Sequence, residues 1–392
     1  WRKMDLNGKT KEEIIKSFEV PAKMKIFTYE GEKDTIMKPK DSIIYYKHML
    51  QTGMMAMEPR NGHIKAWVGG VNYKYFQYDH VGQGARQVGS TFKPFLYATA
   101  IEQLGMSPCD SIIDSYFTMP KGKWGIDADW SPKNSDGNYR GTITLQKALA
   151  NSVNTVSAKL IDRVGPQAVV DMAKELGVTS DIPVQPSIAL GAVDITVEQM
   201  VGAMSTFANQ GVYVKPTFII KIEDKNGVVL DQPVPVTKDV VNKDVAYAVV
   251  KLMEGVTQSG TGSRLKWGGA GFKNYDYSFG NPIAGKTGTS QNNSDGWFIG
   301  MVPNLATGVW VGNEDRAAHF RATRLGQGAT MALPIWGIFM KKCYADSDLD
   351  VSKEPFERPE DLSIKVDCWT PKKVVDSTAV PTDEPDMDEF GL

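Results

Sequence analysis

The sequence has few of the residues that metal sites, disulfide frameworks and histidine-based catalysts require. Its 392 residues include three cysteines and four histidines. The cysteines lie far apart, and their odd number argues against a dense disulfide framework, although the sequence leaves open a pairing of Cys343 with Cys368. No histidine has a partner at the spacing of helical metal ligands. We therefore expect no zinc site, no other metal or cofactor, and no histidine-based triad.

A strong charge of one sign and a long hydrophobic run are also missing. The formal net charge of -2 offers no basic face for nucleic acid or for an anionic membrane. The longest apolar stretch near either end, 333–340, is too short and too interrupted to span a bilayer, and no signal peptide is visible. Because the chain begins at Trp1 rather than Met, we expect a fragment whose membrane anchor lies outside it.

The order of secondary-structure patterns predicts one main domain. Residues 1–45 are charged and mixed and are expected to form a linker or connector. Strand patterns come early and late in 46–345, with helical patterns between them, which predicts an α/β domain with one sheet assembled from both ends around a helical insertion. The remainder, 346–392, is rich in proline and acidic residues and is expected to be a flexible tail.

One Gly-rich stretch, "GNPIAGKTGTS" at 280–290, matches the phosphate-binding pattern G-x-x-x-x-G-K-T. That site requires a helix directly after the loop, because the phosphates bind at the helix N-terminus. Here "GTSQNNSDG" follows Thr287, and its Gly, Asn and Ser residues do not favour a helix. We therefore reject a nucleotide site, while a plain strand containing a glycine fits the local pattern as well as a functional one.

Ser90 and Lys93 form an S-x-x-K pair at the start of a predicted helix. Acyl transfer without histidine needs a nucleophile, a neutral amine to take its proton, and donors for the oxyanion. Residues three apart lie on one helix face, and a helix N-terminus favours developing negative charge. The purely structural alternatives are that Ser90 is the helix N-cap and that Lys93 is a solvent-exposed lysine.

Taken singly, these short motifs carry little weight. S-x-x-K also occurs at 263–266, among glycines, and S-x-N occurs at 152–154 and again at 290–292, whereas K-T-G occurs once, at 286–288. Order and context are what count: S-x-x-K opens a helix, the S-x-N at 152–154 lies in a break between helices, and K-T-G lies on a late strand. This is the motif set of penicillin-recognising serine enzymes.

Longer stretches make the resemblance specific. "RQVGSTFKPFLYATAIEQ", "YRGTITLQKALANSVNTVSAKL" and "GKTGTSQNNSDGWFIGMVPNLATGVWVGNED" resemble the transpeptidase domain of class A penicillin-binding proteins, and the resemblance covers about 20–345. It implies a penicillin-binding/serine β-lactamase-like fold, with an antiparallel sheet flanked by helices plus an all-helical lobe. The family's glycosyltransferase domain and membrane helix have no counterpart here, so we expect a full-length protein anchored at the periplasmic face of the bacterial cytoplasmic membrane.

The resemblance also implies the partners and the role of each site residue. The expected substrates are peptidoglycan stem peptides ending in D-Ala-D-Ala, with β-lactam antibiotics as inhibitors and no nucleic acid as a partner. Ser90 attacks the penultimate D-Ala carbonyl, and Lys93, its charge disfavoured by burial and by Lys286, accepts the proton. The remaining roles are a proton relay by Ser152, substrate backbone binding by Asn154, carboxylate binding by Lys286, Thr287 and Thr289, room for substrate at Gly288, and an oxyanion hole from the backbone N–H groups of Ser90 and Thr289.

Related activities share these motifs. A class A β-lactamase would need an E-x-x-L-N segment, which is missing between Asn154 and Lys286, and Val153 stands where such enzymes have aspartate. A D,D-carboxypeptidase and a β-lactam sensor domain stay open as alternatives. So does the role of Trp124, Trp130 and Tyr139, which either line the cleft or serve packing, whereas Trp297 and Trp310 are expected in the core.

Overall fold

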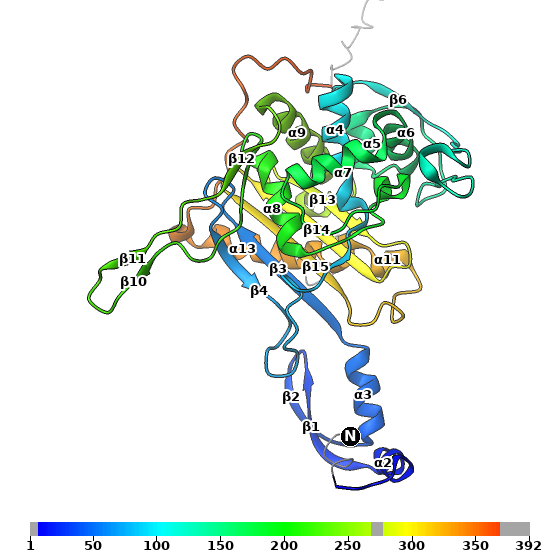
Figure 1. Cartoon of the computed structure of the whole chain (residues 1–392), viewed down its shortest axis with the longest axis vertical. Coiled ribbons are helices and arrows are strands. Elements are labelled where there is room, and N and C mark those ends of the chain that lie inside the picture. Colours follow the sequence, from blue (N-terminus) through cyan, green and yellow to red (C-terminus); the bar gives the residue numbers. More distant parts are fainter. Residues whose placement is uncertain (1–6, 268–276, 369–392) are drawn as a thin grey trace, which may run out of the picture.

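The computed structural model describes residues 7–267 and 277–368, and its main domain is built on one five-stranded antiparallel sheet (Figure 1). The strand order is β13-β14-β15-β3-β4. The strands are β3 (Leu50–Met57), β4 (Ile64–Val68), β13 (Ala284–Thr289), β14 (Asp295–Val302) and β15 (Leu305–Asn313). Pairing of β15 with β3 joins the two ends of the domain, as the sequence predicted.

Both faces of this sheet are buried, because apolar residues alternate between two cores. Met55 and Met57 of β3 belong to the core beneath the helical lobe, whereas Met54 and Ala56 belong to the core on the opposite face. Helices α4 (Lys93–Leu104), α8 (Val197–Ala208) and α9 (Lys243–Ser259) contribute to the first core, and α12 (Gly328–Met331) and α13 (Leu333–Ala345) to the second. The expected core residues Trp297 and Trp310 are fully buried. The antiparallel sheet flanked by helices that the resemblance implied is thus observed.

The predicted helical insertion lies between β4 and β13. Its α-helices are α4 (Lys93–Leu104), α5 (Leu145–Ala150), α6 (Asn154–Val164), α7 (Pro166–Glu175), α8 (Val197–Ala208), α9 (Lys243–Ser259) and α10 (Arg264–Trp267). Its 3₁₀ turns are η1 (Gly89–Phe92), η2 (Lys123–Gly125) and η3 (Pro186–Leu190). After the sheet follow α11 (Thr323–Gly326), α12 (Gly328–Met331), α13 (Leu333–Ala345) and η4 (Ser347–Leu349).

Smaller elements surround this body. The N-terminal region consists of α2 (Lys11–Phe18), β1 (Ala22–Thr28), β2 (Gly31–Met37) and α3 (Pro39–Lys47), and it extends from one end of the main domain (Figure 1). Two-stranded ladders join β5 (Arg86–Gln87) to β8 (Asp194–Ile195), β6 (Ser111–Asp114) to β7 (Gly141–Thr144), and β9 (Val212–Val214) to β12 (Thr237–Asp239). The hairpin of β10 (Ile222–Glu223) and β11 (Val229–Asp231) projects from the body (Figure 1).

The segment after α13 differs from the expectation of a flexible tail beginning at residue 346. Phe356 and Val366 are buried in the core beneath the helical lobe. Cys368 forms a disulfide with Cys109, while Cys343 is a buried free thiol, so the pairing left open for Cys343 and Cys368 does not form. Proline and acidic residues dominate the composition, but two well-placed apolar residues are enough to anchor an extended segment. Residues 369–392 lie outside the described part.

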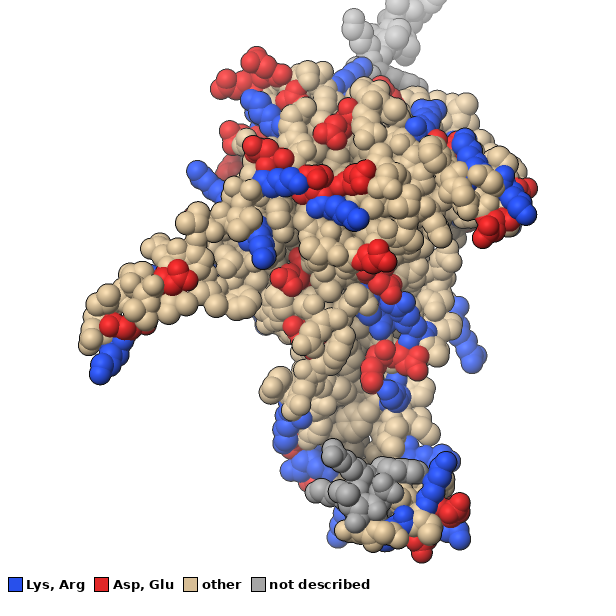
Figure 2. Space-filling view, viewed as in Figure 1, with Lys and Arg blue, Asp and Glu red and all other residues tan. Residues whose placement is uncertain are grey.

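The surface agrees with the balanced composition. Acidic and basic side chains are interspersed over the face drawn in Figure 2, without a large field of one sign. Among residues 7–267 and 277–368, no helix is both long enough and apolar enough to cross a membrane.

A buried ion pair connects the segment before Ser90 to the sheet. Asp295 is fully buried, and Arg86 Nε donates to its Oδ1 over 2.7 Å. The indole of Trp310 and the hydroxyl of Ser294 also donate to this carboxylate, at 3.0 and 2.6 Å. Arg86 further donates to Asn313 O over 2.9 Å. Because Arg86 lies on β5, four residues before Ser90, this network holds the chain that leads into the turn of Ser90 against the sheet.

Removing only one partner of the Arg86–Asp295 ion pair should therefore destabilise the domain strongly. Arg86→Met leaves the Asp295 carboxylate buried without its cation, so we expect a loss of roughly 3–5 kcal/mol in the free energy of unfolding. The exposed pair Arg316–Asp194 provides a matched control, and Arg316→Ala should cost less than about 1 kcal/mol. Urea denaturation measures both, and equal losses in the two variants would contradict this account of the pair.

Candidate active site

Ser90 lies in a tight turn that leads directly into a helix. The turn η1 is 3₁₀, in which side chains three residues apart eclipse one another, and α4 begins at Lys93. Ser90 and Lys93 thus share one face, as the S-x-x-K spacing predicted. Val88 is the N-cap of η1 and no side chain caps the turn, so the alternative that Ser90 is a capping residue is wrong.

Two glycines let the K-T-G strand pack against this turn. Gly89 has φ of +52°, and a Cβ there would lie 2.5 Å from Thr289 O. A Cβ on Gly288 would lie 2.5 Å from Val88 O and 2.9 Å from Thr91 Cγ2. The place beside Gly288 is therefore filled by the turn, whereas the sequence suggested room for substrate there. Because Gly288 has no side chain, the backbone of the K-T-G strand can contact the turn that begins the S-x-x-K motif.

Lys93 is fully buried, which excludes the alternative of a solvated lysine. Its Nζ donates to Ser152 O and to Asn154 Oδ1, both over 2.7 Å, and lies 3.2 Å from Ser152 Oγ. Burial, and in second place the charge of Lys286, hold the pKa of Lys93 well below the usual value for lysine. A neutral amine has two N–H groups and one lone pair, so with both N–H groups donated to oxygens the lone pair is left for a hydroxyl proton.

Lys286 approaches the same hydroxyl from the sheet. It is fully buried, and its Nζ donates to Ser152 Oγ over 3.0 Å and to Thr287 O over 2.9 Å. Burial lowers the pKa of Lys286 to about 7. The hydroxyl of Ser152 thus lies between two amines, and near neutral pH it can accept a proton from one side and donate one on the other. This arrangement has the form of a proton relay.

The S-x-N segment is held in an uncommon conformation between α5 and α6. Ser152 has φ of +55°, in the left-handed region, and Val153 is the N-cap of α6 without a side-chain capping bond. Neither Ser152 nor Asn154 caps the helix, so both side chains are free to face the lysines. Such a conformation costs a non-glycine residue stability and is found where the surroundings impose it.

Asn134 supplies that support, and no sequence motif indicated this residue. Its Oδ1 accepts from the backbone N–H groups of Asn154 and Thr155, at 2.9 and 3.2 Å, and so caps α6 from outside. Its Nδ2 donates to the buried carboxylate of Asp114 over 2.8 Å, to which the Thr155 hydroxyl also donates. These residues lie far apart in the sequence, and no spacing rule connects them.

The motifs meet at a cleft of about 550 Å³. Ser90, Ser152, Asn154, Thr287 and Thr289 line it. Lys93, Lys286 and Gly288 do not line it and are buried. The structure therefore brings the predicted site residues together around one cleft.

Trp130 and Thr261 are among the other residues that line the cleft. Trp130 does so, whereas Trp124 and Tyr139 do not, and the indole of Trp124 donates to Asp162. Thr261 also lines the cleft, with its hydroxyl 2.6 Å from that of Thr287 and its N–H donating to Ala150 O over 3.0 Å. Sequence reasoning missed Thr261, for which the turn-forming G-T-G at 260–262 is the only local signal.

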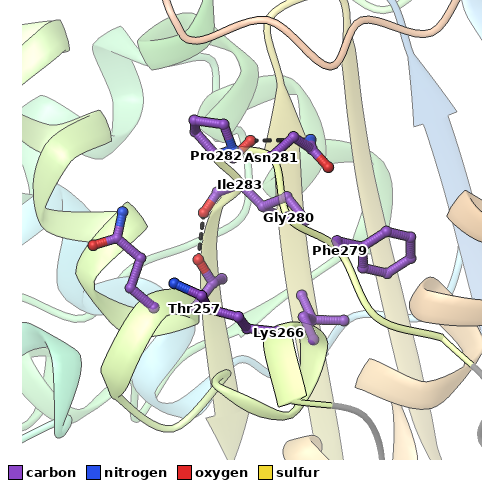
Figure 3. A pocket seen from close by; sticks show the side chains of 9 residues that line it. Thr257, Lys266, Phe279, Gly280, Asn281, Pro282 and Ile283 are labelled. Atoms are coloured by element: carbon purple, nitrogen blue, oxygen red, sulfur yellow. Dashed lines mark hydrogen bonds between the residues drawn. The ribbon is translucent and has the colours of Figure 1, made fainter.

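The second S-x-x-K, the phosphate-binding pattern and the second S-x-N do not form competing sites in the described residues. Lys266 of the second S-x-x-K lines a separate hollow of about 80 Å³ with Gly280 and Ile283 (Figure 3). After Pro282 the chain enters strand β13 and then a turn, not a helix, so the rejection of a phosphate-binding loop is confirmed. The hydroxyl of Ser290, in the second S-x-N, accepts from the N–H groups of Ser294 and Asp295 and holds the β13–β14 turn.

The lowered pKa of Lys286 has a consequence for stability. An unfolded lysine keeps its proton up to about pH 10.4, whereas the folded state releases the Lys286 proton near pH 7. Between these values the unfolded chain binds more protons, so unfolding free energy rises with pH. Relative to Lys286→Met, wild type should gain about 1 kcal/mol per pH unit from pH 7 to pH 10. Denaturant unfolding against pH measures this gain, exposed Lys174→Met should leave it unchanged, and a flat difference between wild type and Lys286→Met would contradict it.

Comparisons with known proteins agree with this geometry. The family described as "Penicillin binding protein transpeptidase domain" matches residues 52–317, and "Penicillin-binding protein middle domain" matches residues 1–50. Penicillin-binding protein 1A of Aquifex aeolicus is 35% identical over 314 residues, which are 78% of this chain and 40% of that protein. The protein of the same name from Neisseria flavescens is 35% identical over 294 residues, 74% of this chain and 35% of that protein.

Solved structures give the same result for the fold. Penicillin-binding protein 1A from Haemophilus influenzae has a TM-score of 0.70 at 24% identity, covering 79% of this chain and 49% of that one. PonA1 from Mycobacterium tuberculosis has a TM-score of 0.65 at 27% identity, covering 79% and 81%. With the transpeptidase match covering more than half of its length, this chain belongs to the penicillin-binding protein transpeptidase family.

Proposed function

We propose that this domain is a peptidoglycan D,D-transpeptidase that cross-links stem peptides through an acyl-enzyme on Ser90 and is inhibited by β-lactams. The observation that carries the proposal is the pair of buried amines, Lys93 and Lys286, on either side of the Ser152 hydroxyl beneath the cleft that Ser90 lines. Acyl transfer needs a nucleophile, a neutral base and a proton path to the leaving amine, and this group of residues supplies all three.

The acylation half-reaction follows from these contacts. Ser90 Oγ attacks the carbonyl carbon of the penultimate D-Ala while its proton passes to Lys93 Nζ. The oxyanion that forms accepts from the backbone N–H groups of Ser90 and Thr289. Ser152 then relays a proton to the nitrogen of the terminal D-Ala, the C–N bond breaks, and free D-Ala leaves an ester on Ser90. In the second half-reaction an amine of another stem attacks the ester, gives up a proton to the relay, and restores the Ser90 hydroxyl.

Substrate binding is proposed to use the strand edge and the hydroxyls beside it. β13 is an edge strand of the sheet, so an extended peptide can lie along it as an added strand. The hydroxyls of Thr287 and Thr289 line the cleft, and with the charge of Lys286 they would hold the terminal carboxylate. Asn154 would hydrogen-bond the peptide backbone from the opposite wall, and Gly288 would serve by keeping Thr289 close to Ser90.

The lining of the cleft favours transfer to an amine over rapid hydrolysis. Among the described residues that line it, none has a carboxylate side chain. A β-lactamase uses such a carboxylate to activate the water that releases the acyl group. We therefore expect a long-lived penicillin adduct. A D,D-carboxypeptidase or a β-lactam sensor would share this chemistry and is distinguished by the acceptor.

The wider context is also proposed. The chain spans 40% of the length of the first relative and 35% of the second. We infer a linker over 1–45 and a transpeptidase domain that begins at 46 and includes the C-terminal segment as far as Cys368. The full-length protein would carry a glycosyltransferase domain and act at the periplasmic face of the cytoplasmic membrane. The Cys109–Cys368 disulfide supports an oxidising compartment.

Acylation by benzylpenicillin, followed by mass spectrometry, tests the assignment. We expect one stable adduct on the peptide that contains Ser90, none with Ser90→Ala, and acylation slowed by ~10²–10⁴-fold with Lys93→Met, because the base is lost. Ser263→Ala and Lys266→Met, in the second S-x-x-K, provide the matched control and should leave the rate unchanged. Labelling that survives Ser90→Ala, or an adduct that hydrolyses within seconds, would overturn the assignment.

A further inference from the structure

A second hollow, of about 910 Å³, adjoins the catalytic cleft. Its wall combines the end of α3 with the loop that follows β15, and includes Tyr45, His319, Phe320 and Arg321. Asn293 lines both this hollow and the cleft, so the two meet at the β13–β14 turn.

Asn293 is held firmly at this junction. It has φ of +59°, and its Nδ2 donates to Phe320 O over 3.2 Å. Gly326 lies so close that a Cβ there would be 2.6 Å from Asn293 Cβ. The β13–β14 turn and the loop after β15 are thus packed against each other, which keeps the two hollows in a fixed relation.

The direction of the donor peptide leads to this second hollow. In the proposed function Lys286 and the hydroxyls of Thr287 and Thr289 hold the terminal carboxylate, and the acylated carbon lies at the backbone N–H of Thr289, so the carboxylate extends from that carbon toward Lys286. The C-terminal end of the donor peptide therefore points toward the start of strand β13. The residues that precede the acylated carbon must therefore continue past Thr289 toward Asn293. An extended peptide advances about 3.3 Å per residue, so each preceding residue brings the donor that much farther along the strand toward the turn.

Arg321 is the charged group that the donor would meet there. Its side chain is exposed, and no carboxylate of the described residues pairs with it, whereas Arg316 pairs with Asp194 and Arg358 with Asp367. The half-buried rings of Tyr45 and Phe320 give the same hollow an apolar wall. A guanidinium without an ion-pair partner, next to aromatic rings, favours binding of a peptide that carries a carboxylate. Arginine binds carboxylates through two parallel hydrogen bonds, in a bidentate geometry.

We propose that this hollow is a subsite for the donor residues that precede D-Ala-D-Ala, and that Arg321 selects donors with a carboxylate in this part. The proposal rests on the proposed function, since it takes the donor's direction from the roles of Lys286 and Thr289. It makes Arg321 a specificity residue that acts on binding of the upstream peptide and leaves the chemistry at Ser90 unchanged.

Three D-alanyl thioester donors test this subsite. One carries two preceding residues with a free side-chain carboxylate, the second has that carboxylate as an amide, and the third lacks both residues. For wild type, the acylation kcat/KM should be about fivefold higher with the acidic donor than with its amide, as expected for an exposed ion pair worth ~1 kcal/mol. Arg321→Ala should abolish this ratio without changing the rate for the short donor, and Arg321→Lys should retain part of it.

Arg324→Ala is the matched control, because Arg324 is an exposed arginine on α11, just after this loop, and its side chain lines neither hollow. It should leave the ratio at its wild-type value. A ratio unchanged in Arg321→Ala, or lost equally in Arg324→Ala, overturns the subsite. If neither the short donor nor benzylpenicillin acylates Ser90 in wild type, the proposed function itself fails, which separates the two results.

Discussion

Two lysine amines are buried within hydrogen-bond distance of one serine hydroxyl, and much of the domain is arranged to hold them there. Removing lysine from water disfavours its charged form, so the folded state accepts an energetic cost near neutral pH in exchange for an amine that can act as a base. Lys93 comes from a helix, Lys286 from a strand, and Ser152 from the break between two other helices. A site of this kind can form only when all three elements are packed together.

The packing around the site reflects this requirement. Glycines at 89 and 288 bring the turn that carries Ser90 and the edge strand β13 into backbone contact. Asn134 and the buried Asp114 hold the start of α6, so that Ser152 keeps its left-handed conformation. On the other side, the Arg86–Asp295 pair fixes the chain just before Ser90 to the sheet. The residues proposed to act in catalysis are few, and the residues that hold them in place are spread over most of the sequence.

This distribution explains how much the sequence could reveal. The sheet assembled from both ends, the helical insertion and the grouping of Ser90, Lys93, Ser152, Asn154 and Lys286 follow from local motifs and from their order. Asn134 and Thr261 could not be found in that way, because their partners are set by the tertiary fold. Composition was misleading for the C-terminal segment, where two buried side chains and a disulfide outweigh many prolines and acidic residues. The pairing of Cys109 with Cys368 spans 259 positions, and no local rule predicts it.

The central claim is that Lys93 is a neutral base and Lys286 a charged anchor near neutral pH. The pH dependence of kcat/KM for acylation by benzylpenicillin tests it most directly, because this constant reports the ionisations of the free enzyme. The rate should rise with pH through the lowered pKa of Lys93 and fall as Lys286 loses its proton around pH 7, and Lys93→Met should lose the rising limb. A rate that keeps rising to about pH 10, where an ordinary lysine titrates, would contradict the account.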